Sequence, residues 1–528
     1  MKKFRRNLFS GFFFFAFLLL IELLLILFLE FFLSDTILAL IPDASEDVSL
    51  IVTLVLLGVR LIGAIAAVII FFKISNRMED PEFKTPWLVG ILILPLFFTF
   101  IYLIFGNHGL RKSDRIIIKA TKNAYNAHFL LTEKEKNQYV NELGPARGVV
   151  GYIHNTTQLG AHKNNKVTYY KNGENFFPEL VERLKEAEDF IFMEFFIITD
   201  GKWWGEVLDI LKDKAQKGVD VRIVYDDMGC SGTISARTPK RLAEYGIKCY
   251  KFHPLRPILS GLYNNRDHRK IVIIDHKYGF TGGMNLADEY ANIGSKFGYW
   301  KDTMLKIEGS AINNLITIFL QNYNLCCGEV SDYNKYLLFD YPKFKEEGFV
   351  MPFGDGPGGI DDALIGEQNY INIINAAQKY CYISTPYLVP TYQLLDSMRN
   401  AALRGVDVRL VVPGIPDKKL VYSVAKSHFR FLLEAGVKIY TYTPGFNHMK
   451  TMLADGEIAF VGTINFDFRS LVHHFECGAT LYKNPCLVDI KSDFEEMFEV
   501  SKEVPKNFKP RFWSRIICTL IRLIYPLL

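Results

Sequence analysis

The sequence predicts an α/β protein in which two similar domains follow an apolar N-terminal region. Three observations lead to this prediction. Three long apolar runs occupy the first 106 residues, helical and strand patterns alternate from about residue 166, and the pattern of the first half recurs in the second. A chain of 528 residues is also too long for one ordinary hydrophobic core.

The apolar runs cover residues 8–33, 48–72 and 87–105. Each run is long enough to cross the hydrocarbon core of a bilayer as a helix. No small-residue cleavage site follows the first run, so we interpret it as an uncleaved anchor rather than a signal peptide. Residues 1–106 are therefore predicted to be a membrane anchor region, and the protein to be a multi-pass protein of the cell membrane.

Charges within and around these runs bear on topology. Glu22 and Arg60 lie near the middle of their runs, where pairing would lower the insertion cost of about 2.5–3.5 kcal/mol each. The basic N-terminus favours the inside, and the loop 34–47, without Lys or Arg, favours the outside. Three crossings would put the rest of the chain outside, whereas the basic stretch 111–122 favours the inside. The side of the membrane stays open.

The two halves share a repeated pattern. Residues 217–224 (KGVDVRIV) match 404–411 (RGVDVRLV). In each half, helical spacing alternates with short apolar strands, which predicts two pseudo-symmetric α/β sandwich domains with mostly parallel sheets. The expected divisions after the anchor are a basic juxtamembrane linker at 107–165, the domains at 166–345 and 346–500, and an interfacial segment at 501–528.

One motif, His-x-Lys-x4-Asp, occurs once in each half, at His268–Asp275 and at His448–Asp455. The apolar residues after each Lys predict a strand, on which residues two apart face the same way. Each His therefore shares a face with its Lys, at Lys270 and Lys450. An imidazole beside an ammonium suits phosphate chemistry, because the imidazole can attack or transfer a proton while the ammonium neutralises negative oxygen.

Further polar residues accompany each motif. A Gly-x-x-Asn turn follows it, and the amides of Asn285 and Asn465 are candidate donors to phosphate oxygens. Asp275 and Asp455 stand an odd number of residues after their His, so we predict that they face away and hold the strand ends.

The paired motifs resemble those of the phospholipase D superfamily, and the chain as a whole is similar to the bacterial cardiolipin synthases. Further similar stretches are 225–229 (YDDMG), 265–270 (NRDHRK), 299–302 (YWKD), 385–390 (TPYLVP) and 465–470 (NFDFRS). The sequence departs from the family at 473–474, His-His where Leu-Asn is more common. The resemblance implies two phospholipase D-like domains, phosphatidylglycerol as substrate, and neither metal nor cofactor.

The resemblance also implies a phosphohistidine mechanism, with His268 as the nucleophile and His448 as the acid and base. The two motifs alone are too symmetric to assign these roles. By the same analogy Asp302 and Glu476 are expected to orient the histidines, each within its own half.

Several functions remain open at this point. Hydrolysis by a phospholipase D, another donor or acceptor lipid, and a non-catalytic membrane scaffold are alternatives to cardiolipin synthesis. Nucleic acid is not an expected partner, because the net charge of +4 is small and no basic stripe is present. The eight cysteines form no Cys-x2-Cys pair, so no metal site is predicted. The oligomeric state is undetermined.

Overall fold

The computed structural model describes residues 46–78, 81–106, 109–129, 142–255, 264–357, 363–509, 518 and 521. The chain forms two compact units, one around the described part of residues 1–108 and one from Gly109 onward. The predicted first apolar run, with Glu22, lies outside the described residues, as does nearly all of the chain beyond 509.

The membrane unit contains one helix that could span a bilayer. Helix α3 runs from Glu46 to Ser75, and its apolar segment Leu50–Ser75 has 26 residues. It is the only helix in the described ranges that is long and apolar enough for a full crossing. The run expected at 48–72 is therefore helical, and the described residues support one crossing rather than several.

The third apolar run is not a single spanning helix. It divides into α4 (Pro81–Ile93) and α5 (Pro95–Phe105), with Leu94 in a non-helical bend (φ −135°, ψ 80°) between them. The rings of Trp87 and Tyr102 lie 5.2 Å apart, whereas a straight helix would separate them by about 22 Å. Pro95 lacks the N–H that would continue the helix, so the run folds back on itself.

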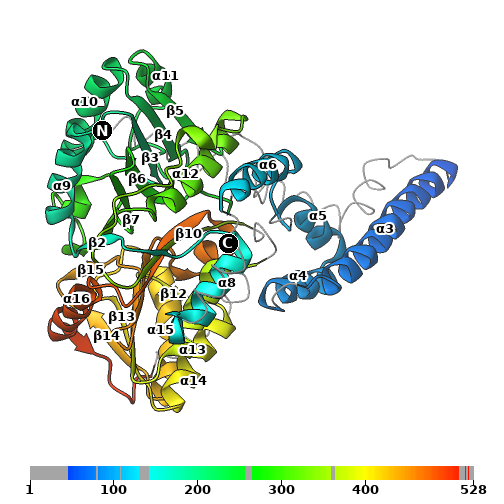
Figure 1. Cartoon of the computed structure of the whole chain (residues 1–528). Coiled ribbons are helices and arrows are strands. Elements are labelled where there is room, and N and C mark those ends of the chain that lie inside the picture. Colours follow the sequence, from blue (N-terminus) through cyan, green and yellow to red (C-terminus); the bar gives the residue numbers. More distant parts are fainter. Residues whose placement is uncertain are drawn as a thin grey trace. The chain divides into compact units, whose positions relative to one another are not determined.

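The first half of the larger unit is a seven-stranded sheet with helices on both faces (Figure 1). The strand order is β2-β9-β7-β6-β3-β4-β5, in which β3, β4 and β5 are parallel. The strands are β2 (Lys166–Tyr170), β3 (Phe190–Phe195), β4 (Asp220–Asp226), β5 (Lys248–Phe252), β6 (Lys270–Ile274), β7 (Tyr278–Gly282) and β9 (Met304–Glu308). The helices are α9 (Gly173–Lys185), α10 (Lys202–Gln216), α11 (Thr238–Ala243) and α12 (Ile312–Cys327).

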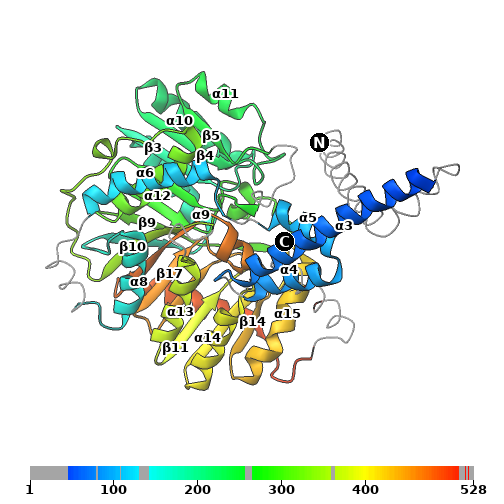
Figure 2. The same cartoon turned by 90° about the vertical axis from the view of Figure 1, so that its right-hand side faces the viewer.

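The second half repeats this plan in a nine-stranded sheet, with order β1-β10-β19-β17-β16-β11-β13-β14-β20. Its strands are β1 (His162–Lys163), β10 (Phe349–Asp355), β11 (Tyr380–Ser384), β13 (Asp407–Pro413), β14 (Lys438–Tyr442), β16 (Thr451–Ala454), β17 (Ile458–Gly462), β19 (Glu476–Tyr482) and β20 (Ser501–Glu503). Helices α13 (Ile365–Ala376), α14 (Tyr392–Leu403) and α15 (Lys419–Glu434) cover one face, and α16 (Leu487–Glu499) lies on the other (Figures 1 and 2).

The two halves share one hydrophobic core. Buried residues of α12, such as Leu315 and Phe319, belong to a cluster that includes Phe192 and Ile271 of the first sheet and Val461 of the second. The predicted pair of α/β sandwiches is thus confirmed, and the two sheets are packed as one body around α12. The expectation of mostly parallel sheets is wrong: only the pairings among β3, β4 and β5, and among β11, β13 and β14, are parallel, and the other pairings in both sheets are antiparallel.

The segment expected to be a basic linker contributes to this body. Its described parts form α6 (Lys112–Phe129), α8 (Arg147–Thr157) and β1. Val149, Val150 and Ile153 on one face of α8 are buried in the core of the second sheet, and β1 pairs with β10. The described part of 107–165 is therefore not only a basic linker, because it includes the amphipathic helix α8. The number of basic residues does not show that one face of this helix is apolar.

Candidate active site

Both His-x-Lys pairs lie at the ends of equivalent strands. Lys270 begins β6 opposite Phe195 at the carboxyl end of β3, and Thr451, directly after Lys450, lies opposite Ser384 at the end of β11. His268 and His448 immediately precede these strands. All four side chains are buried, as expected for a site at the carboxyl edges of two sheets.

Backbone pairing across the two halves joins these edges. Strand β8 (Tyr299–Lys301) runs parallel to β15 (Gly445–Asn447), and His448 N donates to Lys301 O at 2.7 Å. In the same way His268 N donates to Phe475 O at 2.8 Å. Each histidine is therefore held against the residue that directly precedes a carboxylate of the other half.

The carboxylates are exchanged between the halves. Nδ1 of His268 donates to both oxygens of Glu476 at 2.9 Å, and Nδ1 of His448 donates to Asp302 Oδ2 at 2.6 Å. The expected pairing of each histidine with the carboxylate of its own half is wrong. The physical reason is the cross-half strand pairing, which puts Glu476 opposite His268 and Asp302 opposite His448.

Burial determines the charge of both imidazoles. It lowers the pKa of His448 to about 4, with Lys450 acting in the same direction and Asp302 against it. Burial also lowers the pKa of His268 well below its ordinary value, although Glu476 opposes this. Both rings are therefore neutral near pH 7. With Nδ1–H bound to a carboxylate, the lone pair is on Nε2 and is available for attack or proton transfer.

The two lysines are also buried. Burial lowers the pKa of Lys270 to about 8 and that of Lys450 to about 7. Lys450 Nζ lies 3.6 Å from Asp302 Oδ2 and 2.7 Å from His448 Nδ1. A bound phosphodiester would favour the charged form of both ammonium groups, because its negative charge offsets their desolvation.

The motif aspartates fasten the opposite ends of the strands. Asp275 accepts hydrogen bonds from the backbone N–H groups of Glu188, Asp189 and Phe190, at 2.8–3.0 Å. Asp455 accepts the equivalent three from residues 378–380, at 2.7–2.8 Å. The prediction that these side chains face away from the histidines and hold the strand ends is confirmed.

The two asparagines differ in their surroundings. Asn285 accepts from Ile197 N at 3.0 Å and donates to Tyr290 Oη at 2.6 Å, so half of its hydrogen-bonding capacity is used. Asn465 is equally buried, and its carboxamide oxygen has no hydrogen-bond partner among the described residues. Asn465 therefore has more capacity for a bound headgroup.

Sequence reasoning missed the ion pair beneath the first histidine. Arg266 Nε donates to Asp226 Oδ2 at 2.8 Å, and Asp267 N donates to the same oxygen at 3.0 Å. This buried pair fixes the segment that carries His268. The stretches 225–229 and 265–270 contain the two partners. An Asp at the end of one strand and an Arg just before another could therefore have predicted the ion pair.

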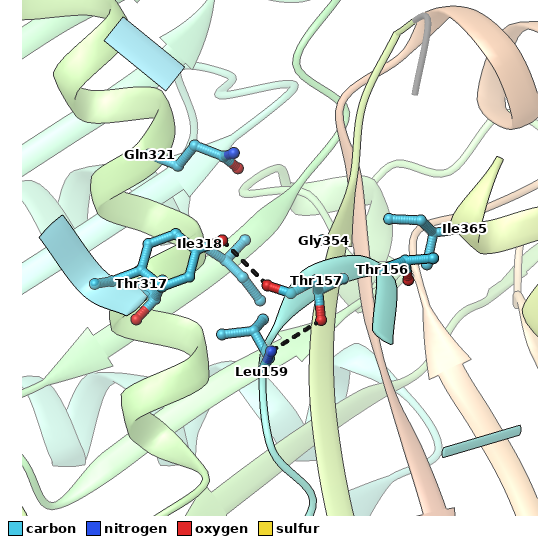
Figure 3. Close-up of a pocket in the computed structure, with 9 residues that line it drawn as sticks. Thr156, Thr157, Leu159, Thr317, Ile318, Gln321, Gly354 and Ile365 are labelled. Carbon is cyan, nitrogen blue, oxygen red and sulfur yellow. Dashed lines mark hydrogen bonds between the residues drawn. The ribbon is translucent and has the colours of Figure 1, made fainter. Parts of the chain in front are cut away.

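Arg269 anchors the next position. Its guanidinium donates to the carbonyl oxygens of Ile318, Asp355 and Glu476, at 3.0–3.1 Å. Beside it a small cavity of about 30 Å³ lies between α8, α12 and β10 (Figure 3). Thr157 and Gln321 contribute to its lining, and the volume suits roughly one or two water molecules, not a lipid headgroup. The histidine pair, and not this cavity, is therefore the candidate active site.

Comparisons with known proteins show which family the chain belongs to. A family model described as "Cardiolipin synthase, PLD-like domain" matches residues 180–316 and 370–499. An uncharacterized protein of Streptococcus mutans is 41% identical over 87% of this chain and 99% of its own length. A cardiolipin synthase of Alkalihalophilus pseudofirmus is 34% identical over 87% of this chain and 91% of its own.

A solved structure shows the same fold at low identity. Phosphatidylserine synthase of Haemophilus influenzae has a TM-score of 0.53 and 15% identity, covering 72% of this chain and all of that protein. The fold is thus that of two phospholipase D-like domains. The family model matches both halves, and the cardiolipin synthase of A. pseudofirmus is more than 30% identical over most of the chain. The chain therefore belongs to the cardiolipin synthase family of phospholipase D-like phosphatidyltransferases.

Proposed function

We propose that this enzyme transfers a phosphatidyl group from one phosphatidylglycerol molecule to another, giving cardiolipin and glycerol. The observation that carries the proposal is the pair of buried, neutral imidazoles, each bound through Nδ1 to a carboxylate of the other half. Two such groups supply a nucleophile and a separate proton carrier, which a two-step transfer requires.

In the first step Nε2 of His268 attacks the phosphorus of the donor lipid. A P–N bond forms, the P–O bond to the headgroup glycerol breaks, and His448, protonated once the anionic substrate is bound, gives its proton to the departing oxygen. In the second step His448 takes the proton from a hydroxyl of the acceptor phosphatidylglycerol. That oxygen attacks the phosphohistidine, the P–N bond breaks, and cardiolipin leaves.

The remaining polar groups support the charged transition state. Lys270 and Lys450 are positioned beside the imidazoles and would neutralise the equatorial oxygens. Asn465 adds a donor amide. Glu476 and Asp302 stabilise the imidazolium form of their histidines, which supports the assignment of one ring as acid and the other as nucleophile. Asp275 and Asp455 would act only through the strands they hold.

We also propose that the catalytic unit faces the same side of the membrane as the N-terminus. Since residues 87–105 fold back, α3 is the candidate crossing among the described residues, and the sequence predicts one more at 8–33. Two crossings return the chain to the starting side, which agrees with basic residues both at the N-terminus and in 111–122. Impermeant labelling of a single cysteine placed at the exposed Met228 of intact cells, compared with lysed cells, tests this; labelling of intact cells would contradict it.

The decisive experiment for the reaction uses the purified full chain and phosphatidylglycerol alone. Equal amounts of cardiolipin and glycerol are expected by chromatography. Phosphatidic acid without cardiolipin would replace the proposal with hydrolysis. Phosphatidylethanolamine or a free alcohol added in competition would identify another donor or acceptor, if one is preferred.

A further inference from the structure

A third imidazole lies beside the first histidine and is not used in the proposed reaction. His474 Nδ1 is 3.5 Å from Glu476 Oε1, and the ring centroids of His474 and His268 are 5.4 Å apart. His474 is only 9% exposed, and its Nδ1 makes no hydrogen bond among the described residues. A buried imidazole nitrogen in this state has a lone pair or an N–H available for a ligand.

The same position in the other half holds a ring that cannot ligate. His474 stands two residues before Glu476, and Trp300 stands two residues before Asp302. Trp300 lies 5.7 Å from the ring of His448, so the two side chains occupy equivalent places. Because indole offers only an N–H donor, a set of two imidazoles and one carboxylate surrounds His268 and has no equivalent at His448 among the residues that the structure describes.

Three ligand atoms of His268, His474 and Glu476 lie within 4.8 Å of one another. Zinc binds imidazole nitrogen and carboxylate oxygen at about 2.0–2.2 Å, which puts neighbouring ligand atoms roughly 3.3 Å apart in a tetrahedral site. The distances of 2.9 Å and 3.5 Å from Glu476 to the two imidazoles are close to this value. A closing movement of the His474 ring would complete the set, with water as a fourth ligand.

We propose that these three residues bind a divalent transition metal ion, with Zn²⁺ as the best match, and that the ion inhibits the enzyme. The ion would occupy Nδ1 of His268, and the proton of that atom would move to Nε2, which would then have no lone pair for attack. The ion would also separate His268 from Glu476. The imidazole would then lose the carboxylate that orients it and stabilises its charged form, so attack on the phosphorus would stop.

The charges around the proposed site affect its affinity for a metal ion. The Glu476 carboxylate favours a cation, whereas the ammonium of Lys270, two residues after His268, opposes one.

The test measures binding and activity separately. Chelator-treated full chain in detergent would be titrated with ZnCl2 by calorimetry, and with Co²⁺ by visible absorption, in the wild type, His474→Asn and the control His276→Asn. One ion per chain is expected for wild type and control. His474→Asn should weaken binding at least about 10-fold, since even the loss of an outer-shell partner has that effect.

The Zn²⁺ concentration that halves phosphatidyl transfer, measured relative to the metal-free activity of each variant, should rise by the same factor in His474→Asn. EDTA should reverse the inhibition. Equal affinity in wild type and His474→Asn would overturn the site. Binding that leaves transfer unchanged would overturn the assignment of His268 as a ligand. The inference rests on the proposed function only for the inhibition, so a chain that binds zinc without making cardiolipin would refute that function and leave the metal site standing.

Discussion

The two halves of the catalytic unit follow one plan but surround their histidines differently. His448 has the shorter carboxylate, Asp302, and lies among the aromatic rings of Tyr290, Trp300 and Phe446. His268 has the longer Glu476, which also accepts a hydrogen bond from Thr463 Oγ1.

The position equivalent to Thr463 is Gly283, where an added Cβ would lie 2.0 Å from Asp302 Oδ1. The shorter carboxylate therefore requires a glycine beside it, whereas the longer one accommodates a threonine. The comparison teaches that the motif itself is symmetric. Any difference in role between the two histidines arises from the residues that surround them and their carboxylates.

The largest expected effect comes from removing either imidazole. His268→Ala and His448→Ala should each reduce kcat by at least roughly 10³-fold, because nucleophile and proton carrier act as a unit. With radiolabelled phosphatidylglycerol, His448→Ala should accumulate a phosphatidyl-enzyme and His268→Ala should not. Accumulation in the opposite variant would exchange the two roles.

Neutralising one carboxylate should affect the histidine of the other half. Glu476→Gln and Asp302→Asn are each expected to lower activity by about 10²-fold, since neither amide stabilises an imidazolium. In protein with isotope-labelled histidine, the NMR signals of His268 should shift in Glu476→Gln and those of His448 in Asp302→Asn. Shifts within the same half would contradict the exchange.

The glycine and threonine beside the carboxylates offer a finer comparison. Gly283→Ala should lower activity more than Thr463→Ala, because the new methyl group displaces Asp302 whereas the lost hydroxyl removes one hydrogen bond from Glu476. We expect about 100-fold and about 10-fold, the range seen for outer-shell partners. Similar losses in kcat for the two variants, with unchanged thermal unfolding, would contradict the claim that the two carboxylates depend differently on the residue beside them.

The motif aspartates should behave alike in both halves and affect stability first. Asp275→Ala or Asp455→Ala leaves three backbone N–H groups without their acceptor, so the free energy of unfolding should fall by roughly 3 kcal/mol. Chemical denaturation in detergent measures this change. Residual kcat of the folded fraction close to that of wild type is expected, and its complete loss would assign the aspartates a part in the chemistry.

The smallest effect is a difference in pH dependence. The lysine pKa values are lowered by burial, so each ammonium is present below its folded pKa and is lost as pH rises through about 7 for Lys450 and about 8 for Lys270. We expect kcat/KM to decline over that window. Lys450→Arg, which stays charged, should remove the lower part of the decline, and an unchanged profile would exclude Lys450 as its source.

The same shifts affect folding in the opposite direction. Between the folded pKa and the ordinary value of 10.5 the unfolded chain binds more protons at these lysines, so stability should rise with pH across that range.

Local pattern predicted much of the fold and of the site. The alternation of helix and strand, the shared face of His and Lys, and the outward position of Asp275 all follow from the period of a strand. The carboxylate pairing could not be predicted in this way. Glu476 lies 208 residues from His268, and the parallel pairing of Asp267 with Phe475 brings them together. The parallel pairing of β8 with β15 does the same for Asp302 and His448.

Hydropathy likewise could not distinguish a crossing from a fold-back. Residues 87–105 are largely apolar, yet one proline and the bend at Leu94 reverse the chain. Whether residues 87–105 cross the membrane or fold back depends on the backbone geometry at Leu94 and Pro95, which composition does not show.

The exchange of carboxylates has a consequence for how such a chain could have arisen by duplication. A single half, on its own, has an imidazole without its acidic partner and a carboxylate without its imidazole. Two copies of one half, related by a two-fold axis, would complete each other twice. Once fused, neither copy could drift alone, because a change in one acidic residue would disable the histidine encoded some 150 to 200 codons away.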